Sequence, residues 1–186
     1  MPVAGGGFEQ CYNAQAAVAA GSLLVVAADV VQAPNDKRQL APMLDKLAAL
    51  PADLGQPETL LADTGYFSAA NVFSAANVET CQTAGIAPLI ALGREHPSLG
   101  ERFAEAPSAP DAPTAVEAMA HRLKTLEGRK LYAQRKHIPE PVFGIIKSVL
   151  GFRQFLLRGL DHVRGEWNLV TMACNLKRMF ALIPAT

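Results

Sequence analysis

The sequence predicts an α/β fold, in which strands alternate with helices around a mostly buried sheet. Half of the 186 residues are hydrophobic and 18% are charged, a composition typical of a globular domain with a core of its own. Short runs rich in valine, leucine, isoleucine and alanine alternate with segments of helical periodicity. This alternation favours a sheet flanked by helices over an all-helical or all-β architecture.

The first elements are expected to be a β-hairpin and a helix. Residues 11–20 and 22–31 are β-like runs that meet at Gly21 and Ser22, a plausible hairpin turn. Asn35 or Asp36 can cap a following helix. The apolar residues of that helix recur at helical spacing: Leu40, Met43, Leu44 and Leu47.

The remaining elements divide the chain into three parts. A strand at 58–63, a helix closed by Gly85 and a strand at 86–92 complete a core domain over residues 1–94. Residues 95–117 hold four prolines and little periodicity, so we expect a proline-rich linker or insertion. Residues 118–186 are expected to be C-terminal helices of the same domain, with breaks near Gly151 and Gly159.

Charge is distributed unevenly along a chain whose formal net charge is zero. Residues 1–128 carry 7 basic and 14 acidic side chains, whereas residues 129–186 carry 10 and 3. This asymmetry favours a polyanion-facing tail on an acidic body. The alternative is two halves of one core that neutralise each other.

The cysteines and the apolar runs point to a cytoplasmic protein without a membrane segment. Cys11, Cys81 and Cys174 lie far apart and form no CxxC pair, which fits a reducing compartment. The apolar run near the front is too short to span a bilayer. The N-terminus also lacks the order of a signal peptide.

Two carboxylates are the candidate functional groups. Asp63 ends the strand at 58–63, where α/β sheets commonly bind ligands, although a turn or helix cap is the simpler interpretation. Glu140 precedes an apolar helix whose N-terminus favours an acid. On that helix, Lys147 and Arg158 are expected to share one face with Glu140, because they follow it by about two and five turns.

These segments resemble the C-terminal part of a bacterial insertion-sequence transposase with a DDE catalytic domain. The resemblance is carried by four stretches: "GGGFEQCYNAQAAV", "PNDKRQLAPML", "LLADTGYFSAANV" and the long run from "YAQRKHIPEPVFGIIK" to "CNLKRM". It implies a ribonuclease-H-like mixed sheet flanked by helices. Tyr132 and Arg135 match part of the family's Tyr-Arg-Glu-Lys signature but lie one residue too far from Glu140.

The resemblance implies a function and a set of site residues. Asp63 and Glu140 match the second and third catalytic acids and would bind Mg²⁺ or Mn²⁺ for DNA strand cleavage and transfer during transposition. Lys147 would contact a DNA phosphate near the cut, and Arg135, Arg153 and Arg158 are further candidates for contacts with double-stranded DNA at the element ends. For Arg153 and Arg158 a solvated helix face is the alternative.

Two departures from the family pattern predict an inactive, truncated copy. The family carries its first catalytic aspartate upstream of the "GGGF" segment, at which this sequence begins, so we expect the first strand and its acid to be lacking. Asp29 is a strand acid, but we do not assign it the missing role. "FSAANV" is duplicated at 67–72 and 73–78. In a helix packed on a sheet, the extra six residues would rotate everything after them away from the packed face. The alternatives are that they loop out or that they extend the helix harmlessly at one end.

Other functions stay open beside that of a transposase fragment. The chain could be a non-catalytic module that binds DNA or that pairs with full-length transposase and inhibits it, and a homo-oligomer is a further expected partner. A sheet without its first strand could also leave an exposed edge and fold poorly. An unrelated hydrolase is disfavoured, because GxSxG, P-loop and GxGxxG motifs are absent from the sequence.

Overall fold

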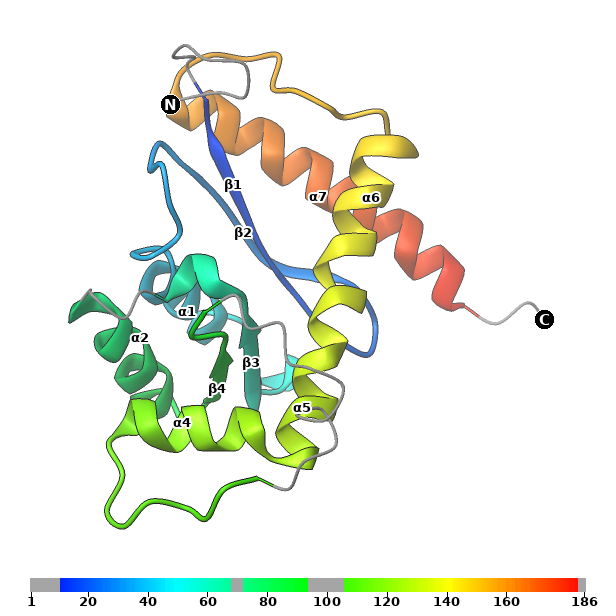
Figure 1. Cartoon of the computed structure of the whole chain (residues 1–186). Helices are drawn as coiled ribbons and strands as arrows, with labels where there is room; N and C mark the ends of the chain where they lie inside the picture. Colours follow the sequence, from blue (N-terminus) through cyan, green and yellow to red (C-terminus); the bar gives the residue numbers. More distant parts are fainter. Residues whose placement is uncertain (1–10, 68–71, 94–105, 184–186) are drawn as a thin grey trace. The chain divides into compact units, whose positions relative to one another are not determined.

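The computed structural model describes residues 11–67, 72–93 and 106–183 (Figure 1). Contacts within the chain divide it into two compact units, one formed by Met1–Asn35 with Lys136–Thr186 and the other by Asp36–Arg135. Helices and strands occur in both units, so the α/β class is confirmed. The described strands form two separate two-stranded sheets, and the ribonuclease-H-like topology and the boundaries at residues 94 and 117 stay predictions.

The first unit is built on the predicted hairpin. Strands β1 (Asn13–Val18) and β2 (Val25–Val31) pair antiparallel, with a register shift between Ala17 and Val18. The amide of Ala19 donates to the carbonyl of Leu24 across the turn, over 2.9 Å. The hairpin therefore forms where the β-like runs and the Gly21–Ser22 turn predicted it.

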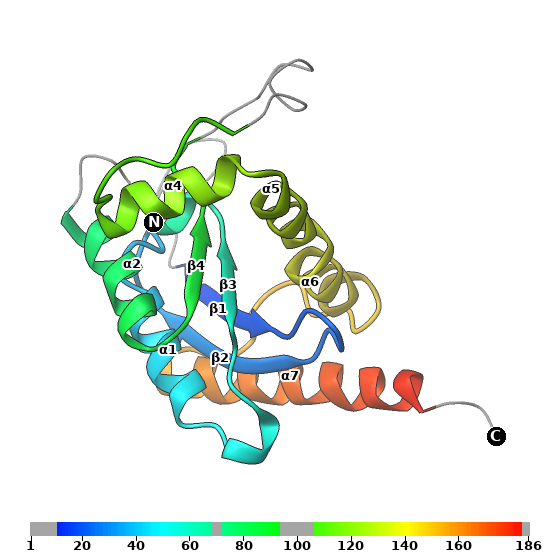
Figure 2. The same cartoon turned by 90° about the horizontal axis from the view of Figure 1, so that it is seen from below.

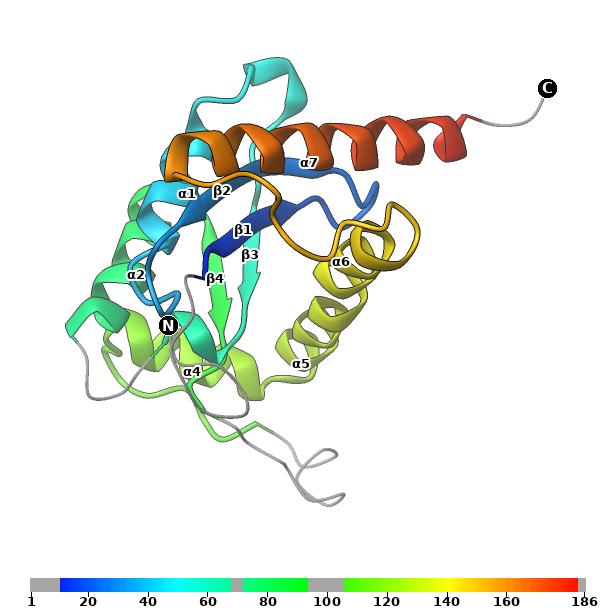
Figure 3. The same cartoon turned by 90° about the horizontal axis from the view of Figure 1, so that it is seen from above.

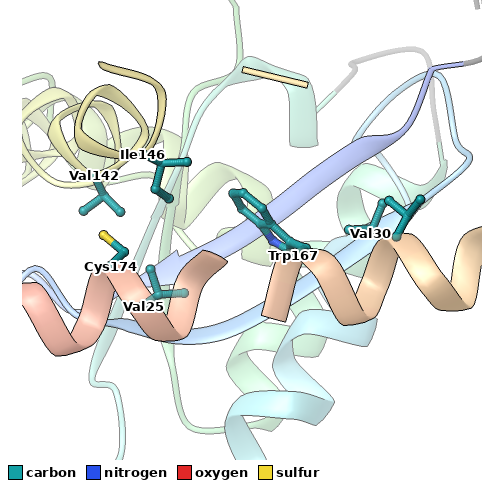
Figure 4. Close-up of a cluster of buried hydrophobic side chains, with 7 residues drawn as sticks. Val25, Val30, Val142, Ile146, Trp167 and Cys174 are labelled. Carbon is teal, nitrogen blue, oxygen red and sulfur yellow. The ribbon is translucent and has the colours of Figure 1, made fainter. Parts of the chain in front are cut away.

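Helices α6 (Pro139–Ser148) and α7 (Leu160–Leu182) pack on this hairpin, and α7 runs along β2 (Figure 3). Figure 4 shows the buried cluster between them. Its centre is Trp167, which is 2% exposed and donates its indole N–H to the carbonyl of Gln15. The remaining members come from β2 and the two helices: Val25, Val30, Val142, Ile146, Val163 and Cys174.

Leu176 does not belong to this core. The sequence run "GEWNLVTMACNLKRM" predicts that Trp167 and Leu176 are core residues. This prediction is correct for Trp167 and wrong for Leu176, whose side chain is 49% exposed. The reason is the position on α7. Helix α7 turns one face toward the hairpin, and Leu176 lies nine residues after Trp167, half a turn away from that face.

Polar side chains of α7 complete the attachment to β2. The side-chain amide of Asn175 accepts from the amide of Val25 and donates to its carbonyl, both over 2.8 Å. Arg164 donates to the carbonyl of Val30 and to Asp29, 3.0 Å away. These bonds satisfy main-chain groups of the strand that would otherwise need water. Asp29 therefore has a structural role, in agreement with our leaving it unassigned.

The second unit contains a parallel β–α–β arrangement (Figure 2). Strand β3 (Thr59–Ala62) pairs in parallel with β4 (Ala87–Ile90), and helix α2 (Val72–Thr83) connects them. Gly85, at φ +73°, lies between α2 and β4, where the sequence predicted the helix to end. A parallel pair requires such a crossover connection, and the connecting helix packs on β4.

Helix α1 (Leu40–Ala48) buries the predicted apolar face. Its four buried side chains are Leu40, Met43, Leu44 and Leu47. The predicted cap by Asn35 or Asp36 is wrong, because Gln39 occupies the N-cap position without a side-chain hydrogen bond. A 3-10 turn, Ala52–Leu54, follows before β3.

The run "AVEAMAHRLKTLEGRKLYAQRK", residues 115–136, predicts one helical segment. The structure divides it into helices α4 (Ala115–Lys124) and α5 (Leu126–Ala133). Thr114 begins α4 with a capping box to Glu117. Thr125 ends α4 and caps α5, because its hydroxyl donates to the carbonyl of Arg122 and accepts from Gly128. A Cβ on Gly128 would lie 1.8 Å from the Arg122 oxygen, so only glycine permits this tight break.

The duplicated hexapeptide lies at the start of α2. Residues 68–71, most of the first copy, are outside the described residues. In the second copy, Asn77 donates to the carbonyls of Lys37 and Tyr66, and Val78 is fully buried. Asn77 and Val78 of the second copy therefore fix the register in which α2 packs.

Candidate functional site

Asp63 directly follows β3 and begins the 3-10 turn η2 (Thr64–Tyr66). Its Oδ1 accepts from the amide of Gly65 over 2.8 Å, so the cap interpretation left open by the sequence is confirmed. The side chain is 50% exposed. Capping and ligand binding are compatible here, because the second oxygen, Oδ2, is not used by the turn.

Two residues of α5 and the turn after it reach the same end of β3. Tyr132 donates its hydroxyl to the carbonyl of Ala62, the residue before Asp63, over 3.2 Å. Arg135, in the 3-10 turn η3 (Gln134–His137), brings Nη1 to 3.8 Å from Asp63 Oδ2. Its guanidinium carbon lies 5.8 Å from the centroid of the Tyr132 ring, within cation–π range.

The electrostatics of this cluster follow from burial and from its charges. Burial raises the pKa of Tyr132, Asp63 adds to the rise and Arg135 opposes it. The Nε of Arg135 is buried, and among the described residues it has no hydrogen-bond partner. The Arg135 side chain is 20% exposed, and a guanidinium held beside a half-exposed carboxylate can also bind a phosphate oxygen through its accessible N–H groups.

Asp36 is a second carboxylate at this position, and sequence reasoning missed it. A Cβ built on Gly65 would lie 2.9 Å from Oδ2 of Asp36 and 2.9 Å from Oδ1 of Asp63, so both oxygens approach one point. Burial, and then these two acids, raise the pKa of Tyr66 well above its usual value. The "PNDKRQLAPML" stretch contained the signal, but Asp36 was interpreted there as a helix cap.

Glu140 and Lys147 lie on α6, as the sequence predicted. Pro139 occupies the first turn, where a proline is favoured because its missing N–H has no helical partner. Glu140 is in that first turn and Lys147 in the last. Both side chains are exposed, and seven residues place them on one face.

Arg158 does not share the face of Glu140 and Lys147, contrary to the prediction. Helix α6 ends at Ser148 and α7 begins at Leu160, so Arg153 and Arg158 lie in the irregular connection between them. Gly151, at φ +72°, follows the end of α6. Arg153 and Arg158 are exposed, and Arg153 Nε donates to the carbonyl of Lys147 over 3.5 Å.

The structure thus brings together some of the predicted residues. Asp63 and Arg135 meet in the unit Asp36–Arg135, whereas Glu140, Lys147, Arg153 and Arg158 belong to the other unit. Between Tyr132 and Glu140 the chain passes through the 3-10 turn η3 and Ile138 before α6 begins. Tyr132, Arg135 and Glu140 therefore do not lie on one continuous helix.

The residues at Asp63 fit a hard divalent cation. Carboxylate oxygens are the ligands that Mg²⁺ and Mn²⁺ prefer, and two adjacent carboxylates lower the energy of a cation beside them. Gly65 leaves open the space that a Cβ would fill between the two oxygens. Within the described ranges, however, no group of three or more His, Cys, Asp or Glu side chains could hold a metal ion.

Comparison with known proteins finds one match. Residues 106–180 match a family model described as the transposase DDE domain, which supports a transposase-type function. The matched segment runs from the residues before α4 to α7 and contains Tyr132, Arg135, Glu140 and Lys147, but not Asp63. No curated protein and no solved structure matches the chain. None of the helices in the described parts of the chain has the length and apolar character needed to cross a membrane.

Proposed function

We propose that this chain is a DDE-type transposase component that acts on the double-stranded DNA at the ends of an insertion sequence. One observation carries the proposal. Tyr132 and Arg135 belong to the segment that matches the transposase DDE domain, and both contact the end of β3 at Ala62 and Asp63, outside that segment. Asp63 is thereby linked to the matched segment by contacts that are independent of the match.

In this proposal Asp63 and Glu140 are the metal-ligating carboxylates. When bound, Mg²⁺ or Mn²⁺ would activate the attacking oxygen and stabilise the leaving 3′-oxygen of the DNA strand. Asp63 contributes Oδ2, because Oδ1 is held by the amide of Gly65. Asp36 adds negative charge beside Asp63 and favours a cation there. Glu140 contributes a carboxylate that is exposed at the start of α6.

The basic residues would hold the DNA backbone. Lys147 lies on the same helix face as Glu140 and would contact a phosphate near the cut. Arg153 and Arg158 are exposed after α6 and would add contacts that depend on salt. Arg135 would offer the exposed part of its guanidinium to a phosphate oxygen next to Asp63.

A second candidate function is a non-catalytic DNA-binding fragment, or one that pairs with full-length transposase and inhibits it. The observation that favours it is the small number of metal-ligating groups: within either unit, the described residues gather no three of them. Such a chain would retain the basic surface of residues 129–186 while binding metal weakly and leaving DNA strands uncut.

The test combines DNA binding with strand nicking by the full chain. We expect binding to duplex DNA that weakens with salt. Mn²⁺-dependent nicking of supercoiled plasmid should be very weak, because the first catalytic acid is expected to be lacking, and it should fall to the metal-free level in Asp63→Asn and in Glu140→Gln. Asp53→Asn, an exposed acid of the same unit as Asp63, is the matched control and should retain nicking. Binding without nicking would support the second function. Absence of DNA binding would contradict both the transposase function and a DNA-binding fragment.

A further inference from the structure

Helix α7 is apolar on two opposite faces, and only one of them is covered. The inner face packs on the hairpin through side chains that are at most 5% exposed: Val163, Trp167, Thr171 and Cys174. The opposite face carries five large apolar side chains that are 49% to 74% exposed, which we name the outer stripe: Leu169, Met172, Leu176, Met179 and Phe180. A helix that is apolar all round is normally buried on all sides.

The spacing of the outer stripe indicates that a helix covers it. Leu169, Met172, Leu176 and Met179 follow one another at intervals of three, four and three residues. This is the alternation of a coiled-coil seam, in which each apolar side chain enters a gap between four residues of the facing helix. Scattered exposed apolar residues would not keep this register along two and a half turns.

The charges of α7 favour a second copy of the same helix as the facing helix. In a symmetric pair the seam of one copy faces the same seam of the other copy. A charged residue in the seam would therefore lie close to a charge of the same sign. Between Leu169 and Phe180 the only charged residues are Lys177 and Arg178. Both lie off the outer stripe, and Arg178 Nε donates to the carbonyl of Ser22 on the inner side, over 2.7 Å.

The area of the stripe reaches the lower limit for a specific pair. Five apolar side chains, each about half exposed or more, would bury on the order of 1,000 Å² across a symmetric pair, which reaches the range of specific interfaces. A groove of about 340 Å³ adjoins the stripe, bounded by Val25–Ala28 of β2 and by Met172, Leu176 and Met179. It extends the contact surface beyond the helix itself.

We propose that the outer stripe of α7 is the seam of a homodimer in which the α7 helices of two copies pack against each other. This inference is independent of metal ligation and of DNA cleavage, because it uses none of the residues assigned to them. The seam would link two copies through a helix that is fixed to its own hairpin by Asn175 and Trp167.

The test is the molar mass of the full chain in solution without DNA or metal, measured by light scattering over a wide range of concentrations. We expect twice the chain mass for the wild type and a halved mass for the double variant Met172→Lys, Leu176→Lys. The matched control is Ala181→Lys, an exposed position of α7 off the stripe, which should stay dimeric. A wild type that is monomeric at all concentrations, or a double variant that stays dimeric, would overturn the proposal.

A crosslinking measurement keeps the proposal testable if the double variant fails to fold. Leu176→Cys in a Cys11→Ser background should form a covalent dimer on mild oxidation, because the seam brings two copies of position 176 close together. Ala181→Cys in the same background should form none. Equal crosslinking at the two positions would contradict pairing through the outer stripe.

Discussion

Tyr132 and Ala62 are 70 residues apart in the sequence, and the Tyr132 hydroxyl donates to the Ala62 carbonyl over 3.2 Å. This bond anchors the end of α5 to the last residue of β3. Arg135 follows Tyr132 by three residues, less than one turn, so its guanidinium is carried to Asp63. The position of Arg135 beside the predicted metal ligand therefore depends on a contact between distant segments of the unit.

Replacement of Arg135 should separate metal binding from DNA binding. Arg135→Gln removes a positive charge 3.8 Å from Asp63 Oδ2, so Mn²⁺ affinity should rise about two- to fivefold, the scale of a partly exposed ion pair. DNA affinity should fall, because a phosphate ligand is lost. Calorimetric titration with Mn²⁺ and fluorescence anisotropy with duplex DNA measure the two changes. Lys130→Gln, an exposed charge on α5, should leave Mn²⁺ affinity unchanged.

Gly65→Ala should weaken metal binding without unfolding the chain. The new Cβ would lie 2.9 Å from an oxygen of Asp36 and 2.9 Å from an oxygen of Asp63, so one or both carboxylates must move. We expect Mn²⁺ affinity to fall by about tenfold, as when the supporting shell of a metal site is disturbed. Gly93→Ala, with no atom within 4 Å of its Cβ, is the control. Equal affinities of both variants and the wild type would exclude Asp63 as a ligand.

Asn175→Ala should destabilise the unit formed by the hairpin and α7. It removes two 2.8 Å hydrogen bonds and leaves the amide and carbonyl of Val25 without their side-chain partner. The expected loss in free energy of unfolding is about 1–3 kcal/mol. Urea denaturation measures it. Asn168→Ala, an exposed position two turns earlier on the helix, should change stability by less than about 0.5 kcal/mol. A similar loss of stability in both variants would show that the loss comes from replacing an asparagine on α7 and not from the two hydrogen bonds to Val25.

Cys81 should make stability fall in alkaline solution. Burial raises the pKa of this thiol from the ordinary value of 9.0 to about 11, so the folded state keeps a proton that the unfolded state has released. Stability is therefore fully present below pH 9 and decreases as the pH rises from about 9 to about 11, by about 1–2 kcal/mol.

The measurement is the free energy of unfolding in urea as a function of pH. Cys81→Ala should show a smaller decrease between pH 9 and 11 than the wild type, because its side chain does not titrate. Cys11→Ala is the control, since Cys11 is only partly buried, and it should follow the wild type. Identical pH profiles of Cys81→Ala and the wild type would contradict the prediction that the Cys81 thiol causes the loss of stability in alkaline solution.

Local patterns were sufficient to predict most of the helices and strands. The hairpin, the apolar face of α1 and the helix end at Gly85 each depend on a window of a few residues, within which backbone hydrogen bonds and side-chain periodicity are decided. The break at Thr125 was missed, because the close approach of Gly128 to Arg122 is visible only in three dimensions.

The sequence by itself determined the α/β class and the order of most elements, because these follow from short-range chemistry. The site residues Asp63, Glu140 and Lys147 are predicted through the resemblance of longer motifs to a family, and they stay predictions. Only the tertiary structure decided which face of α7 is buried, since both faces are apolar and the hairpin selects one of them through Trp167. It also placed Asp36 and Arg135 at Asp63. Contacts between segments this far apart depend on the path of the whole chain, and no periodicity within a segment encodes them.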